Sequence, residues 1–473
     1  MQATFPLPFH GYKQGRFNSM ITLIQMEFKF FLPYKLKRIL LCSSAVLVAA
    51  ALLTSTSRSA RAQLYAGAAR VDITPDTSVM QVPLGGYIAR KGAFATGVHD
   101  RIYARALVLS AANTKIGLVS VDLCFIPANF RMEIGKRVAA AGVVGLDLDH
   151  LMIAATHSHT SPDPLAMHAV NTSDMKGWTS YTPTLAKFEA GKIAQAIILA
   201  DHRMMPAKIG FGTLDATGSN RNRRGEKTTD PTMTLVRVTD DQGRSLAAII
   251  NFAAHPTLYD DKMMEISADW PGAMCGWLEN TMGGDAVAMF LNGAEGDASP
   301  NGAAGANASR RVENYGRGLG EKAWDILRLM QLQSAVPIQA WRETVDLPSP
   351  KPNALFVIAA RSFGATMAQA QEIVKQLMPT TTTIGFFRVG GLLLIGFPCE
   401  PTGELGLAAK ADARKVGFNT PAVVALADDW LAYALTTAQY REGNYEAGMS
   451  FYGDQFGPLL LKAVVHGLSR GGK

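Results

Sequence analysis

Two histidines and one glutamate are spaced along the sequence in a way that could bind a catalytic metal ion. His157, His255 and Glu400 each follow a short apolar run that is typical of a β-strand. Two neutral imidazoles and one carboxylate are a common ligand set for catalytic zinc, which keeps a further position for water or substrate. The three residues therefore predict a hydrolytic zinc site.

Each of these residues also has an ordinary interpretation. In the His-x-His pair of His157 and His159, either ring could be a ligand while the other faces substrate, but surface histidines show the same spacing. His255 alone is also compatible with a hydrogen-bonded histidine in the core. Glu400 is harder to explain in this way, because a carboxylate at the end of an apolar run is costly to bury unless it is paired or bound to metal.

A glycine-rich stretch at residues 293–301 is the second feature that suggests chemistry. Its glycines let the backbone approach a substrate, and Asp297 and Asn301 flank Ser299, whose hydroxyl they could fix by local hydrogen bonds. The same composition is also typical of a turn. The stretch is not the G-x-S-x-G elbow that carries the nucleophile in α/β-hydrolases.

These residues need a scaffold that brings distant strand ends together. Apolar runs predict strands at residues 104–109, 116–121, 151–155, 233–238, 246–252, 287–291, 383–389, 392–396 and 423–427. Helical patterns occur at 129–141, 184–200, 310–332, 365–377 and 403–416. The alternation indicates an α/β fold with a mixed β-sheet core layered with helices. Because carboxyl ends of strands form the ligand crevice of α/β sheets, the polar residues after five of these strands are expected to converge. The five strands are 151–155, 246–252, 287–291, 392–396 and 423–427, and the last runs into Asp428, Asp429 and then Tyr433.

Composition limits the function further. The chain has 473 residues and 48% apolar content, enough for a large globular core. Residues 1–62 carry eight Lys and Arg against the single acid Glu27, which leaves 38 basic and 38 acidic residues in the remainder. This balance gives no basic surface for nucleic acid. Three of the four cysteines lie beyond residue 62, and an odd number does not form a complete disulfide framework.

Residues 1–62 have the pattern of an export signal. Basic residues at 35–38 precede the apolar run 39–53, and a small-residue segment ends in Ala-Arg-Ala at 60–62 before Gln63. We expect cleavage before Gln63 and a periplasmic or secreted protein. An uncleaved signal anchor is the alternative, and the true start of translation could be a methionine within this leader.

Several sequence motifs occur in an order that a known enzyme family shares. They are Gly-Val-His-Asp-Arg at 97–101 with Ala-Arg-Ala at 104–106, Ala-Thr-His-Ser-His-Thr at 155–160, Arg-Asn-Arg at 221–223, the strand end at 252–255, Gly-Asp-Ala-Ser-Pro-Asn at 296–301, Pro-Cys-Glu at 398–400, and Tyr-Ala-Leu-Thr-Thr at 433–437 followed by Tyr440 and Tyr445. In this order they resemble the neutral/alkaline, non-lysosomal ceramidases. The hexapeptide at 296–301 differs from the family's Gly-Asp-Val-Ser-Pro-Asn only at Ala298, and the resemblance runs from about residue 67 to 453.

The resemblance implies roles for eight residues. The implied zinc ligands are His157, His255, Glu400 and Tyr433; the residues along the substrate amide or its head group are His159, Arg223 and Tyr445; and the essential serine is Ser299. The resemblance leaves open whether the serine attacks the carbonyl or orients substrate beside a zinc-activated water. We favour the water, because the sequence shows no dedicated His-Asp relay for the serine.

The implied function is zinc-dependent hydrolysis of the amide bond of an N-acyl compound, either a ceramide-like lipid or a smaller substrate. The same metal site could instead serve an esterase or lactonase, because an activated water does not choose its leaving group. The third interpretation, beside the amidase and the esterase or lactonase, is a non-catalytic surface protein with a structural metal site. The partners expected are a small-molecule or lipid N-acyl substrate and transient contact with a membrane surface; no oligomeric state is indicated.

The chain also departs from the family pattern. Ser-Pro-Asp-Pro at 161–164 stands where the family usually has Gly-Pro-Gly-Gly, and the stretch between Ser299 and Glu400 is shorter than in other members. We expect a single catalytic domain over residues 63–473 without a C-terminal immunoglobulin-like domain. The shorter stretch predicts a preference for smaller N-acyl substrates. The helix at 365–377 is then either an ordinary core-facing helix or a lid that restores a long-chain groove.

Overall fold

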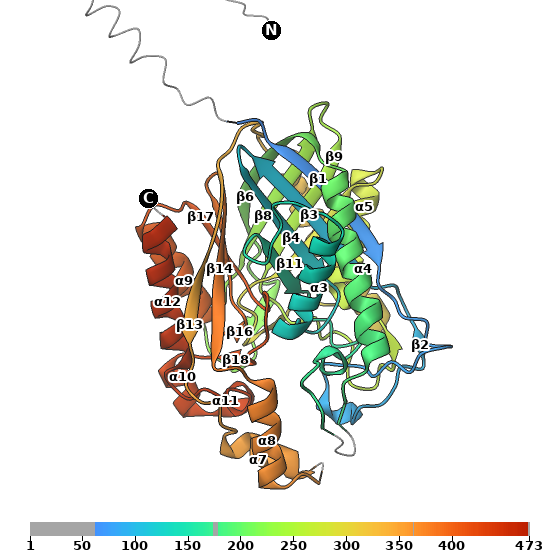
Figure 1. Ribbon diagram of the computed structural model, residues 1–473, viewed down its shortest axis with the longest axis vertical. Helices are drawn as coiled ribbons and strands as arrows, with labels where there is room; N and C mark the ends of the chain where they lie inside the picture. Colours follow the sequence, from blue (N-terminus) through green and yellow to red (C-terminus); the bar gives the residue numbers. More distant parts are fainter. Residues whose placement is uncertain (1–61, 174–177, 363, 472–473) are drawn as a thin grey trace, which may run out of the picture. The chain divides into compact units, whose positions relative to one another are not determined.

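The computed structural model describes residues 62–173, 178–362 and 364–471. The export signal expected at residues 1–62 therefore lies almost wholly outside the described residues. Within them, two β-sheets lie face to face, and helices cover the outer face of each sheet (Figure 1). This four-layer arrangement confirms the expected α/β fold with a mixed β-sheet core, and it shows that the core contains two sheets.

The larger sheet has eight strands within the described residues, in the order β11-β9-β8-β6-β1-β3-β4-β5. The β4–β5 and β9–β11 pairs are parallel and the other pairs are antiparallel. In chain order the strands are β1 (Tyr65–Asp72), β3 (Tyr103–Ala111), β4 (Thr114–Val121), β5 (Leu151–Ala155), β6 (Met205–Asp215), β8 (Thr232–Asp240), β9 (Ser245–Phe252) and β11 (Val287–Asn292).

The smaller sheet has the order β13-β14-β15-β17 among the described residues, with only the β15–β17 pair parallel. Its strands are β13 (Ile338–Asp346), β14 (Thr381–Val389), β15 (Leu392–Gly396) and β17 (Thr420–Val424). In the described part of the chain, three short strand pairs lie outside the two sheets: β2 (Gly97–Val98) with β10 (Glu265–Ile266), β7 (Asn220–Asn222) with β12 (Ala298–Pro300), and β16 (Glu400–Pro401) with β18 (Tyr433–Ala434).

The side chains of each strand point alternately to two apolar cores, which explains why the predicted runs are apolar at every position. Along β11, Val287, Met289 and Leu291 join the core between the sheets, whereas Ala288 and Phe290 join the core beneath the helices. Side chains of a strand point alternately to its two faces, so a strand between two layers needs apolar residues at every position.

Helices cover the outer face of each sheet. Those over the larger sheet are α3 (Ala128–Ala140), α4 (Pro183–His202), α5 (Asp269–Met282) and α6 (Ala308–Leu327); those on the side of the smaller sheet are α7 (Ala354–Ser362), α8 (Met367–Leu377), α9 (Gly403–Lys415), α10 (Thr437–Glu442), α11 (Asn444–Gly448) and α12 (Phe456–Gly471). Two 3₁₀ turns, at Ile88–Arg90 and Pro164–Met167, lie in the loops. No helix among the described residues is long and apolar enough to cross a membrane.

Two predicted elements end earlier than expected. The run at 423–427 leaves the sheet after Val424, because Leu426 and Asp428 adopt positive φ values of 53° and 70°. The helix predicted to reach residue 332 ends at Leu327, and Gln333 instead forms a bridge with Ile209 of β6. In both cases the chain follows a tertiary contact rather than its local pattern.

Candidate metal centre and substrate cleft

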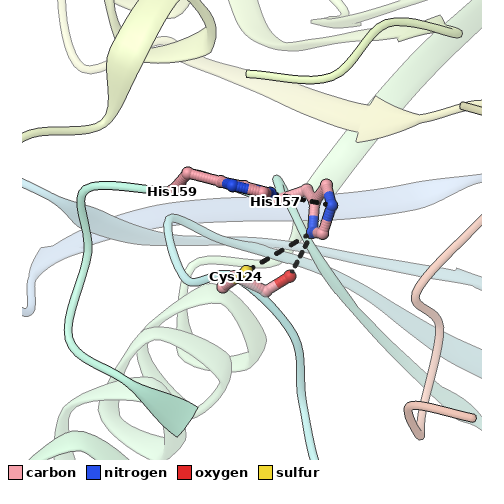
Figure 2. Close-up of side chains that lie close together, drawn as sticks. All are labelled: Cys124, His157 and His159. Atoms are coloured by element: carbon pink, nitrogen blue, oxygen red, sulfur yellow. Dashed lines mark hydrogen bonds between the residues drawn. The ribbon is translucent and has the colours of Figure 1, made fainter. Parts of the chain in front are cut away.

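His157 lies directly after the carboxyl end of β5, in a backbone conformation that is uncommon for a residue with a side chain. Its φ is 75°, in the left-handed region. Its Nδ1 donates a hydrogen bond to the carbonyl oxygen of Cys124 at 2.7 Å, and the Cys124 Sγ lies 3.6 Å from the same nitrogen (Figure 2). With its proton fixed on Nδ1, the neutral ring presents the lone pair of Nε2 to the centre of the site.

His255 is held in the same way from the end of β9. Its Nδ1 lies 2.8 Å from the carbonyl oxygen of Glu295 and 3.1 Å from that of Ala298, both in the glycine-rich loop. Burial, reinforced by the positive charge of Arg223, lowers the pKa of His255 to about 3. The ring is therefore neutral at physiological pH, and its Nε2 presents a lone pair to the centre of the site.

Glu400, the first residue of β16, completes a cluster of three donor atoms. Its Oε2 lies 3.2 Å from Nε2 of His157 and 3.3 Å from Nε2 of His255. This oxygen is buried and has no well-aligned hydrogen bond among the described residues, whereas Oε1 accepts one from Trp430 Nε1 at 3.0 Å. Two imidazole lone pairs and a carboxylate oxygen that face one another need a cation between them, so this donor set fits a metal ion.

The protonation of His157 follows from the same cluster. Burial opposes its charged form, but the Glu400 carboxylate and the Cys124 thiol raise the pKa of His157 well above its ordinary value. The pKa of Glu400 is held well below its ordinary value, since His157 and His255 outweigh the effect of burial. Either a proton or a metal ion must therefore balance the carboxylate, and a metal ion would displace the proton.

Tyr433 and Arg223 lie on one side of this cluster. Tyr433 pairs with Glu400 across the β16–β18 ladder, and its hydroxyl lies 3.2 Å from His255 Nε2. Arg223 Nη2 donates to that hydroxyl at 3.1 Å and to the Gly296 carbonyl at 2.8 Å. Burial and the Glu400 carboxylate raise the pKa of Tyr433 well above its ordinary value, so its hydroxyl keeps its proton when no metal ion is bound.

His159 and Tyr445 lie at the edge of the cluster. Nε2 of His159 is 3.1 Å from Nε2 of His157, while its buried Nδ1 has no hydrogen-bond partner among the described residues. Burial, with the two other histidines, lowers the pKa of His159 well below its ordinary value. The ring of Tyr445 meets that of Tyr433 edge-on at 5.7 Å, and Tyr445 remains 56% exposed. The structure thus brings seven of the eight implied site residues together.

The hydroxyl of Ser299 lacks the hydrogen bonds expected from its two neighbours. Ser299 lies in β12 opposite Arg221 of β7, it is partly exposed, and its hydroxyl makes no hydrogen bond to a described residue. The flanking side chains do not fix it: Asp297 accepts hydrogen bonds from Asn222 Nδ2 and the Gly403 amide, and Asn301 donates to the Gly218 carbonyl. The idea that the two neighbours orient the serine was wrong, because they tie the loop to neighbouring segments instead.

An open cleft leads to the cluster. His157, His159, Glu400, Tyr433 and Tyr445 supply the polar lining at the cluster, and the cleft also borders Asp163 and Thr179. Most of the remaining wall is apolar and includes Leu84, Ile88, Phe125, Trp178, Phe356, Ile373, Val374, Leu377, Trp430 and Phe451. Three of these side chains come from α8, so the helix expected at 365–377 forms part of the cleft wall.

Comparison with known proteins places the chain in a family. Residues 64–315 match the family described as neutral/alkaline non-lysosomal ceramidase, N-terminal. The chain belongs to this family. The neutral ceramidase of Pseudomonas aeruginosa is 24% identical over an alignment that covers 82% of this chain and 69% of that protein. Neutral ceramidase B of Dictyostelium discoideum is 28% identical over 262 residues, which cover 50% of this chain and 35% of that protein.

A solved structure shares the fold. The crystal structure of the Pseudomonas aeruginosa neutral ceramidase superposes with a TM-score of 0.73 and 22% identity, over 86% of this chain and 75% of that one.

Two residues of this ceramidase-family site were missed in the sequence. Cys124 lines the cleft beside His157, and Trp430 binds Glu400 and stacks on Phe125 with 4.1 Å between ring centroids. Cys124 follows the run at 116–121, so applying the strand-end rule to that strand as well would have found it. Trp430 follows the run at 423–427. It lies in the sequence between Asp429 and Tyr433, which were both expected near the site.

Asp428 and Asp429 were expected near the site and lie elsewhere. Asp428 accepts hydrogen bonds from Arg131 at 2.7 Å, Arg342 at 2.8 Å and the Ile153 amide at 2.9 Å, so it joins α3, β13 and β5. Asp429 accepts a hydrogen bond from the amide of Ala128, the first residue of α3. Asp428 thus links the smaller sheet to the larger one, whereas Asp429 fixes the start of α3.

Proposed function

We propose that this protein is an exported zinc-dependent amidohydrolase that cleaves the amide bond of an N-acyl lipid, with ceramide as the first substrate to test. The observation that carries the proposal is the cluster of His157, His255 and Glu400 at an apolar cleft. Three donor atoms there face one another, and the far side of each imidazole is fixed by a backbone carbonyl. The similar proteins named neutral ceramidases support the choice of substrate.

In this proposal His157, His255, Glu400 and Tyr433 hold the zinc ion. When bound, zinc supplies Lewis-acid chemistry: it lowers the pKa of water to about 7 and polarises a carbonyl group. The backbone carbonyls that accept from both Nδ1 atoms keep the rings oriented, as outer hydrogen bonds do in metal sites.

His159 and Arg223 are suited to the substrate amide. His159 lines the cleft as a neutral ring, and its unpartnered Nδ1 is available for a hydrogen bond to substrate. Arg223 keeps its charge, because Tyr433 and Glu446 outweigh burial and raise its pKa. Its Nε and Nη2 are engaged, while Nη1 makes no hydrogen bond to a described residue and could stabilise a developing negative charge. The apolar wall would cover the acyl chain, at about 0.8 kcal/mol for each buried methylene.

The test combines metal analysis with a substrate panel. We expect one zinc per chain in the wild type and hydrolysis of N-acyl sphingosine that a chelator abolishes. His255→Ala should lose the zinc and at least about a hundredfold in activity, as expected for removal of a catalytic ligand. His150→Ala is the matched control, since this partly exposed histidine pairs only with Asp147.

The panel also separates the alternatives. Activity on O-acyl esters without activity on N-acyl compounds would favour an esterase on the same site. Full zinc and full activity in a folded His255→Ala protein would show that the site is wrongly placed.

A further inference from the structure

Helix α7 is apolar on every side, although it stands at the protein surface. All seven residues from 354 to 360 are apolar. Phe356 and Val357 are buried, but Leu355 and Ile358 remain 47% and 62% exposed. A helix without a polar face is usually enclosed by protein or by lipid, and large exposed apolar side chains gathered on one element mark an interaction surface.

The inner face of α7 fixes its position beside the cleft. Phe356 lines the cleft, and its ring meets that of Phe451 edge-on at 5.1 Å. Asn353 caps the helix by accepting from the Phe356 amide at 3.0 Å. Figure 1 shows α7 and α8 together beyond the ends of β13 and β14, with α11 beside them. The exposed face of α7 therefore lies next to the wall through which an apolar substrate would enter.

The charged residues of α7 and of the chain next to it in sequence are positive. The exposed Lys351 precedes the helix and the exposed Arg361 lies in its last turn, and the sequence has no acidic residue between Asp346 and Glu372. An apolar segment with cationic flanks is the composition that binds the interface of a membrane with anionic lipids. Met367, at the start of α8, adds another apolar side chain that is 48% exposed.

We propose that the outer face of α7 inserts Leu355 and Ile358 into the surface of an anionic phospholipid bilayer, so that a membrane lipid passes into the cleft without crossing water. The inference rests on the proposed function only for the lipid that enters the cleft. Docking itself can be measured without turnover.

The test uses the full-length chain, in which the leader is common to every variant. Phosphatidylcholine vesicles with and without phosphatidylglycerol are the probes. The double substitution Leu355→Asp and Ile358→Asp should weaken co-sedimentation with the anionic vesicles by at least about tenfold, since charged residues are costly in the apolar layer. The control carries Leu329→Asp, just beyond α6, and Val465→Asp, on α12, at positions that are 70% and 50% exposed, and it should bind like the wild type.

Hydrogen exchange supplies a local readout that the leader does not affect. We expect vesicles to slow exchange of the amides of α7 and not those of α12, and 1 M salt to weaken binding. Hydrolysis of a short, soluble N-acyl substrate should be unchanged in the double variant. The proposal is overturned if this variant sediments like the wild type, or if α7 exchanges equally with and without vesicles. A protein that docks but hydrolyses no N-acyl substrate would contradict the proposed function and leave the docking intact.

Discussion

Gly296 lies directly against the backbone of Glu400. A Cβ atom on Gly296 would come within 2.6 Å of the Glu400 carbonyl oxygen, and the Gly296 amide donates to the Pro401 carbonyl at 2.9 Å. The glycine-rich loop also supplies the carbonyl of Glu295 that orients His255. One loop thus positions two of the three donor atoms of the cluster.

Replacement of Gly296 should disturb the metal centre more than it disturbs the fold. Gly296→Ala forces the Glu400 backbone to move, so we expect zinc affinity to fall by at least about tenfold and stability by about 1–3 kcal/mol, as for other overpacked sites. Gly318→Ala is the control, because a Cβ there meets nothing within 4 Å and helix α6 favours alanine. Zinc titration and thermal unfolding measure both effects. Wild-type zinc affinity in Gly296→Ala would mean that this close contact does not set the ligand geometry.

Ser299→Ala should lower kcat by about a hundredfold or more while leaving the melting temperature nearly unchanged. The hydroxyl is partly exposed and has no hydrogen bond to a described residue, so its loss removes little folding energy. If a zinc-activated water is the nucleophile, pre-steady-state kinetics should show no burst of covalent acyl-enzyme. Isolation of a wild-type adduct acylated at Ser299 would instead make the serine the nucleophile.

The stability contributed by Asp428 should disappear at low pH. Although burial disfavours its charge, Arg131 and Arg342 hold the pKa of Asp428 below its ordinary value. A carboxylate with a lowered folded-state pKa stabilises the protein fully above the unfolded value of about 4, and this stabilisation is lost as the pH falls through the folded value.

Asp428→Asn isolates this charge, because asparagine tolerates the positive φ of 70° at the position. We expect a loss of about 3–5 kcal/mol at pH 7, since two largely buried arginines lose their partner. Denaturant unfolding at pH 7 and at pH 3 should show a smaller difference at the lower pH. An equal loss at both values would assign the effect to packing rather than charge.

The dependence on acyl length follows from the wall that α8 provides. The short stretch between Ser299 and Glu400 predicted a preference for smaller N-acyl substrates, which would give an early plateau of kcat/KM as the acyl chain lengthens. Ile373, Val374 and Leu377 nevertheless line the cleft. We therefore expect kcat/KM to rise by up to about fourfold per methylene until the cleft is filled. Val374→Ala should reduce the slope and Gln376→Ala should not. A plateau at short chains in the wild type, measured below micelle formation, would restore the earlier expectation.

Export of the protein should remove the leader. The basic residues at 35–38, the apolar run at 39–53 and the Ala-Arg-Ala site predict a mature N-terminus at or near Gln63. N-terminal sequencing of protein recovered from the periplasm or medium measures this directly. Exported material that begins upstream of residue 39 would indicate an uncleaved anchor.

The sequence alone determined the chemical groups and the class of fold. Apolar runs alternate with helical patterns over short windows, so β5, β9 and β15 and the polar residues that follow them are visible from local periodicity. The types of donor atom likewise follow from the sequence, since an imidazole and a carboxylate keep their chemistry in any fold. Family motifs then associated His157, His255 and Glu400 with one site.

Only the tertiary structure decided which segments meet. His157 and His255 follow strands of the larger sheet, whereas Glu400 and Tyr433 lie beyond strands of the smaller one, and the cluster exists because the two sheets pack face to face. The same packing turns Asp428 toward Arg131 and Arg342, away from the site, although its position in sequence resembles that of the others. Such outcomes depend on long-range contacts and on positive φ angles between strands, which local sequence patterns do not specify.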